Sequence, residues 1–172
     1  MSLFGYYNNE LSPVTQPRYP LRINVGFLVY QPIGTYRDFD FELPVVQLSP
    51  DFEINNLNGT AHISRTPQGL LVEAEFSGSL LQECVRCLEE YAQPLHTNFS
   101  ELYAFRYRRN TESELYVPED GQIDLAPLAR DYLMLEMPIK SICRPDCQGL
   151  CTMCGENLNL TTCEHQAQGV KE

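Results

Sequence analysis

The chain has 172 residues and a formal net charge of -11, and 43% of its residues are hydrophobic. This length suits one domain with a small appendage, and the apolar content excludes global disorder. No apolar run reaches the roughly 18 residues that a membrane span requires. The N-terminal residues resemble neither a secretory signal nor a transit peptide, so we expect a cytoplasmic protein.

The acidic charge argues against an autonomous nucleic-acid-binding protein, because such proteins carry a basic surface. The chain contains 7 cysteines, an odd number that a complete set of intramolecular disulfides cannot use. The cytoplasm would also keep these thiols reduced. The cysteines are therefore expected to be buried hydrophobes, catalytic thiols or metal ligands, and their spacing must separate these roles.

The first part of the chain is predicted to form an arm followed by strands. Residues 1–20 are rich in Pro, Asn and Tyr without a clear period, which indicates an extended N-terminal arm. Hydrophobic and polar residues then alternate over 21–27 and 38–43, as in half-buried strands. Asn58-Gly59 indicates a turn into a third strand, and Pro67-Gln68-Gly69 a hairpin turn between two strands.

Further strands are predicted up to Cys84 and over 91–107. Gly78 is expected at a bend or bulge after the return strand of the hairpin (72–76), before the strand to Cys84, and Pro94 is expected to interrupt the last strand. About six antiparallel strands result, which favours a small barrel or sandwich because open sheet edges must be closed or covered. Residues 110–124 are acidic, which predicts a solvated connection or a contact for a basic partner.

One helix is predicted over about 124–136. Asp124 is a favourable N-cap, Pro127 lies in the first turn and Pro138 ends the apolar pattern. We expect this helix to pack on the sheet. The expected fold class is β-rich α+β, a barrel or sandwich with one covering helix and a C-terminal zinc-binding tail. The predicted parts are an arm (1–20), a β-rich domain with the helix (21–142), a cysteine-rich segment (143–166) and a flexible tail (167–172).

The cysteines form two groups. Cys84 and Cys87 make a CxxC pair, which presents two sulfurs on one tight turn to one tetrahedral ion. Thiol–disulfide centres share this spacing, so a redox dithiol or plain core packing remain alternatives. The second group follows the helix and resembles a zinc knuckle at Cys151–Gly155; its members are Cys143, Cys147, Cys151, Cys154 and Cys163, with His165 beside the last.

Seven cysteines and His165 supply eight donors, which suffices for two four-coordinate sites. We predict one zinc held by Cys84, Cys87, Cys143 and Cys147, and another held by Cys151, Cys154, Cys163 and His165. A single zinc that draws on a mixture of these residues is the main alternative, and an iron–sulfur cluster is another. His62 and His96 lack ligand spacing and suit ordinary strand positions.

A basic patch beside the metal is a second candidate site. Six cations lie near the cysteines or at the end of the last long strand: Arg86, Arg106, Arg108, Arg109, Lys140 and Arg144. They could contact a partner on an otherwise acidic body, and the alternative is that they are scattered solubilising charges.

Three elements in order carry a family resemblance: ECVRCLE at 83–89, the helix segment GQIDLAPLARDYLMLEMPI, and CRPDCQGLCTMCGENLN followed by Cys-x-His. Together they resemble the YceD family of large ribosomal RNA subunit accumulation proteins, over roughly residues 20–166. The family pattern commonly ends in Cys-x-Cys, whereas this chain has His165 at the last position. The resemblance implies a ribosome-biogenesis factor that is needed for large-subunit rRNA to accumulate.

The residues themselves show no nucleophile with its base, no phosphate-binding glycine loop and no catalytic metal motif. A non-catalytic zinc protein that binds rRNA or a ribosomal protein is therefore the leading hypothesis. No membrane contact or small-molecule substrate is expected. The alternatives are a thiol–disulfide redox protein that uses Cys84 and Cys87, and a DNA-binding zinc ribbon, which the acidic tail disfavours.

Overall fold

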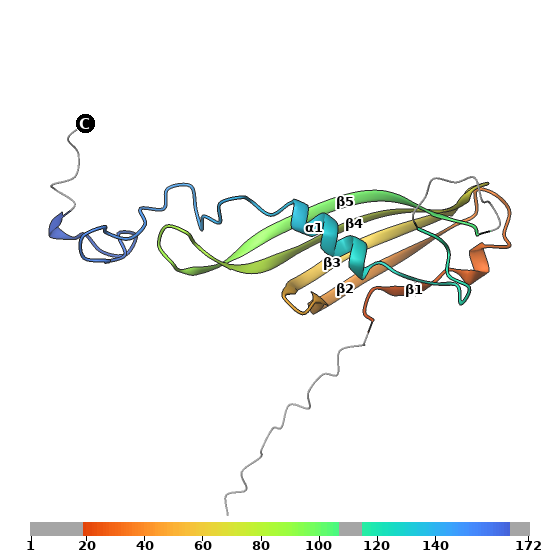
Figure 1. Ribbon diagram of the computed structural model, residues 1–172, viewed down its shortest axis with the longest axis horizontal. Helices are drawn as coiled ribbons and strands as arrows, with labels where there is room; N and C mark the ends of the chain where they lie inside the picture. Colours follow the sequence, from red (N-terminus) through yellow and green to blue (C-terminus); the bar gives the residue numbers. More distant parts are fainter. Residues whose placement is uncertain (1–18, 107–114, 166–172) are drawn as a thin grey trace, which may run out of the picture.

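The computed structural model describes residues 19–106 and 115–165 of the chain (Figure 1). Outside this range lie residues 1–18 of the expected arm, Arg108, Arg109, residues 110–114 of the acidic stretch and the tail 167–172. The described elements are β1 (Arg22–Asn24), the 3-10 helix η1 (Gly26–Leu28), β2 (Tyr36–Ser49), β3 (Phe52–Arg65), β4 (Gly69–Glu83), β5 (Glu90–Ala104), β6 (Gln122–Asp124) and α1 (Ala126–Leu135).

The body of the protein is a four-stranded antiparallel sheet in the order β2-β3-β4-β5. Buried and exposed residues alternate along these strands, so one face of the sheet is apolar and the other is polar. The hairpin of β4 and β5 is long and reaches beyond the other strands at one end (Figure 1). This extension carries the first pair of cysteines away from the core.

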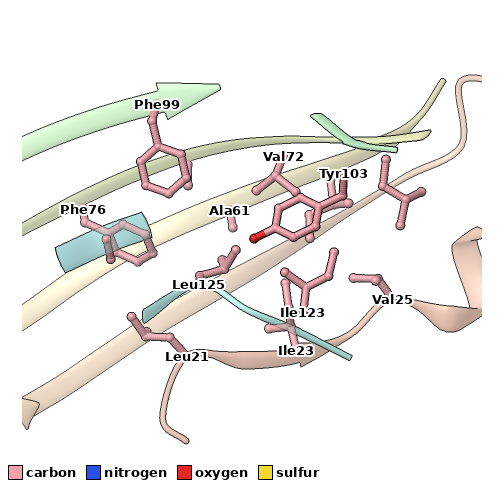
Figure 2. Close-up of a cluster of buried hydrophobic side chains, with 14 of the residues drawn as sticks. Leu21, Ile23, Val25, Ala61, Val72, Phe76, Phe99, Tyr103, Ile123 and Leu125 are labelled. Carbon is pink, nitrogen blue, oxygen red and sulfur yellow. The ribbon is translucent and has the colours of Figure 1, made fainter. Parts of the chain in front are cut away.

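A second layer covers the apolar face. β1 and β6 pair antiparallel, and Ile23 of β1 lies opposite Ile123 of β6. Both point toward the sheet, where Ala61 and Tyr103 meet them (Figure 2). Helix α1 follows β6 and contacts β5 and β2. The predicted class, β-rich α+β with antiparallel strands and one covering helix, is confirmed; the sheet is open, with β2 and β5 at its edges.

Several local predictions are wrong, and packing explains them. Asn58 and Gly59 lie inside β3, and the turn before this strand is at Pro50-Asp51 instead. Pro94 does not interrupt β5, because an edge strand tolerates a residue without an N–H. The strand that leads to Cys84 is the end of β4 and not a separate strand.

Other local predictions from the sequence agree more closely with the structure. The predicted turn at Pro67–Gly69 connects β3 to β4, and the pairing of these strands shifts beside Gly78, between Asn55 and Asn58. The prediction of Asp124 as N-cap is wrong by one residue, because Leu125 occupies that position and Asp124 ends β6. The Asp124 side chain still accepts a hydrogen bond from the Ala126 N–H at 3.0 Å. Strand β6 was not predicted, because three residues carry no detectable period. No helix in the described part of the chain is long and apolar enough to cross a membrane.

Candidate metal centres

The first cysteine cluster joins two segments that are far apart in the sequence. Cys84 and Cys87 lie in the turn between β4 and β5, and the segment after α1 runs back along this turn. The Val85 N–H donates to the Ser141 carbonyl at 2.9 Å, and the Arg86 side chain donates to the Cys147 carbonyl at 3.1 Å. These bonds bring Cys143 and Cys147 to the CxxC turn.

Two sulfur–sulfur separations in this cluster match the edge of a zinc tetrahedron, and all four sulfurs lie within 4.8 Å of one another. The Sγ atoms of Cys84 and Cys147 are 3.8 Å apart, and those of Cys87 and Cys143 are 3.7 Å apart. Four thiolates at a Zn–S distance of about 2.3 Å form a tetrahedron with edges of about 3.8 Å. Cys84, Cys87 and Cys147 are buried, so their surroundings suit a structural ion better than an exchangeable one.

Backbone N–H groups act to lower the pKa values of thiols in this cluster, whereas burial acts to raise them. Backbone N–H groups, that of Cys143 foremost, lower the pKa of Cys84 to about 6 against its desolvation. Burial and the neighbouring thiols raise the pKa of Cys143 to about 12. The pKa values of these neighbouring thiols are shifted in opposite directions. All four sulfurs can be thiolates together only if a cation compensates their negative charge.

The second cluster is local to the C-terminal segment. The donor atoms of Cys151, Cys154, Cys163 and His165 all lie within 4.8 Å of one another. Gly155 has a φ of +76°, which lets its N–H turn back to the Cys151 carbonyl at 2.8 Å. The N–H groups of Cys154 and Met153 lower the pKa of Cys151 to about 6. Three sulfurs and one imidazole make a donor set that suits zinc.

Asn157 and Asn159 connect the cysteine segments, and the sequence did not single them out as site residues. The Asn159 side chain accepts from the Gln148 N–H at 2.8 Å, and its amide points to the Cys147 sulfur at 3.4 Å. Asn157 donates to Glu89, next to the CxxC turn, at 3.3 Å. The only sequence signal was their place in the GENLN motif, where asparagine side chains can hydrogen-bond nearby backbone.

The predicted basic residues do not all come together. Arg86, Lys140 and Arg144 lie on the segments that build the first cluster. Arg106 follows the far end of β5, a strand of 15 residues that spans about 45 Å, and pairs with Glu119 at 3.4 Å. The described part of the predicted patch is therefore divided between two ends of the molecule. His62 and His96 lie on the sheet, outside both clusters, as the sequence predicted.

A family model for the large ribosomal RNA subunit accumulation protein YceD matches residues 72–172. The chain belongs to the YceD family. The match covers both cysteine clusters and α1.

The similar proteins come from bacteria and plants. An uncharacterized protein of Mycobacterium leprae is 27% identical over 86% of this chain and 69% of its own length. One from Mycobacterium tuberculosis is 32% identical over 54% of this chain and 47% of its own, so this match spans about half of the relative. The chloroplastic large ribosomal RNA subunit accumulation protein YCED homolog 1 of Zea mays is 40% identical over 30% of this chain and 18% of its own. No solved structure matches the chain.

Proposed function

We propose that this protein is a non-catalytic factor that supports accumulation of large-subunit rRNA, with a zinc ion in each cysteine cluster. Membership of the YceD family carries the first part of the proposal, because the matching plant proteins bear the rRNA-accumulation name. The sulfur separations of the first cluster carry the second part. The factor would act in the cytoplasm on rRNA or on a large-subunit ribosomal protein.

Zinc would act structurally at both sites. Each cluster offers four protein donors, and a zinc ion with four protein ligands has no open position for water or substrate. The first ion would hold the β4–β5 turn to the segment after α1. The second would hold the knuckle at Cys151–Gly155 to the last described residues.

A thiol–disulfide centre at Cys84 and Cys87 is less well supported. Cys143 and Cys147 lie within 4 Å of this pair, so four sulfurs converge where a redox dithiol uses two, and four sulfurs suit a metal site better. The lowered pKa of Cys84 suits a metal ligand as well as a reactive thiol, so it does not favour redox chemistry.

Metal analysis of the full chain tests the zinc sites. We expect two zinc ions per chain by elemental mass spectrometry, and one after Cys151→Ser together with Cys154→Ser. Slow alkylation of the native cysteines should accompany full loading. One ion in the wild-type chain, a bound iron–sulfur chromophore, or fast reaction of Cys84 in the loaded protein would contradict the proposal.

Complementation tests the cellular function. In a bacterial strain that lacks its own YceD-family protein, the wild-type chain should restore the ratio of large- to small-subunit rRNA. The paired variant Cys84→Ser and Cys87→Ser should fail to restore it, while the control variant Val85→Ser, at an exposed position of the same turn, should succeed. Equal rescue by the two variants would show that the first cluster is dispensable for the function.

A further inference from the structure

The polar face of the main sheet forms an acidic platform that no described element covers. α1 and the β1–β6 pair lie on the opposite face (Figure 1). Three cross-strand rows of outward residues build the platform: Asp38, His62, Glu73 and Ser100; Asp40, Thr60, Glu75 and Asn98; Glu42, Asn58, Ser77 and His96. All of these residues are exposed except His62, which is half-buried.

The platform carries unbalanced negative charge. Five of its positions are carboxylates and none is Lys or Arg, so it stays negative even when both histidines are protonated. His62 contacts Asp38 at 2.6 Å and His96 approaches Glu75 at 3.7 Å. Along β2, neighbouring carboxylates on this face lie about 7 Å apart. Such like charges repel, which costs stability in the isolated protein.

The centre of the platform is hollowed. Short side chains of β3 and β4 lie between longer carboxylates, which leaves a hollow of about 620 Å³ lined by Asp40, Glu42 and Glu75 with Asn58, Thr60 and Ser77. A second hollow of about 330 Å³ adjoins it and shares Thr60 and Glu75. Long side chains could enter these hollows and reach the carboxylates.

We propose that this platform binds an Arg- or Lys-rich segment of a protein partner. Cationic side chains would relieve the carboxylate repulsion and would find hydrogen-bond acceptors at both hollows. The same charge repels RNA and anionic membranes, so the platform is not the surface that meets rRNA. The inference rests on the proposed function for the cellular setting, in which a basic partner is met during assembly of the large subunit.

Binding of a defined peptide to the full, zinc-loaded chain tests the proposal. The probe is a fluorescein-labelled peptide of alternating Arg and Ser, and a peptide of alternating Glu and Ser is its control. We expect the triple variant Asp40→Asn, Glu42→Gln and Glu75→Gln to weaken binding about tenfold. This variant should fold normally, because it removes repulsion, and circular dichroism with a thermal melt checks this.

A matched variant separates the platform from net charge. Glu90→Gln, Glu119→Gln and Glu136→Gln change the net charge equally, but they lie on exposed positions outside the three rows. We expect this variant to weaken binding by less than about twofold. Equal weakening by both variants, or no binding of the Arg–Ser peptide to the wild type, would overturn the proposal.

A labelled single-stranded RNA oligonucleotide tests the other class of partner. We expect the triple variant to bind this RNA at least as well as the wild-type chain does. A loss of RNA affinity in the triple variant would overturn the proposal. These measurements use purified protein. If the peptide does not bind the platform, the zinc content and the rRNA rescue still test the proposed function independently. Conversely, failed rescue by the wild-type chain would contradict the function and leave the peptide result intact.

Discussion

At the scale of single residues, Gly59 shows how packing selects an amino acid. The Phe76 ring is fully buried, and its centroid lies 5.7 Å from that of Phe41 and 6.1 Å from that of Phe99. A Cβ atom at Gly59 would overlap this ring and the Glu75 carbonyl oxygen of the neighbouring strand. Glycine is therefore required here for close approach of Phe76 and not for a turn.

We expect Gly59→Ala to lower the free energy of unfolding by about 2 kcal/mol, because the core is overpacked. Urea denaturation followed by circular dichroism measures the change. Gly26→Ala is the matched control, since the nearest atoms to an added Cβ there are 3.4 Å away. A Gly59→Ala protein as stable as the Gly26→Ala protein would show that the ring can move aside without cost.

At the scale of elements, α1 packs on the sheet through Tyr132 and through the buried side chains of Ala129 and Leu133. The Tyr132 ring stacks on Phe99 of β5, with centroids 4.7 Å apart and planes 12° apart. Its hydroxyl donates to Glu101 of the same strand at 2.5 Å, and this hydrogen bond raises the pKa of Tyr132. Leu133 beside it is fully buried. Helix and sheet are thus joined by both apolar and polar contacts.

Two substitutions at Tyr132 should separate these contributions. Tyr132→Phe keeps the stacking and loses the hydrogen bond, so we expect a loss of about 1 kcal/mol. Tyr132→Ala loses both, and we expect about 3 kcal/mol. Equilibrium unfolding in urea measures each value. Equal losses for the two variants would assign the whole contribution to the hydroxyl.

At the scale of the whole molecule, the buried side chains of the described residues fall into two separate groups. The larger one lies between the sheet and its covering layer, and the smaller one surrounds Cys84, Cys87 and Cys147. The smaller group lies at the extended end of the β4–β5 hairpin, away from α1 (Figure 1). A metal ion bound here would supply stability that a hydrophobic core provides elsewhere in the molecule.

The two proposed ions should therefore differ in their effect on stability. Cys84→Ser releases a link between distant segments, so we expect the melting temperature to fall by about 10 °C. Cys154→Ser loosens only a local segment, and we expect a fall of less than about 3 °C. Differential scanning calorimetry of the zinc-loaded chains compares them. Similar losses for the two variants would contradict the division of ligands between a linking site and a local site.

Strand alternation and the helix around Leu128 were predictable from the sequence, because both depend on the local period of apolar residues. The division of the eight donors could also be proposed from spacing, and the structure brings the same two sets together. The turn before β3 and the continuity of β5 were mispredicted. In both places a Gly or a Pro was interpreted locally, although its strand position decides its role.

The remaining features depend on contacts between residues that are distant in sequence. Strand β6 exists because β1 pairs with it, and Asn159 matters because folding places it beside Cys147. The separation of Arg106 from Arg86 follows from the length of one hairpin, and the acidic platform follows from the register of four strands. Local periodicity specifies which residues are apolar, cationic or thiol-bearing, whereas strand order and register determine which of them become neighbours.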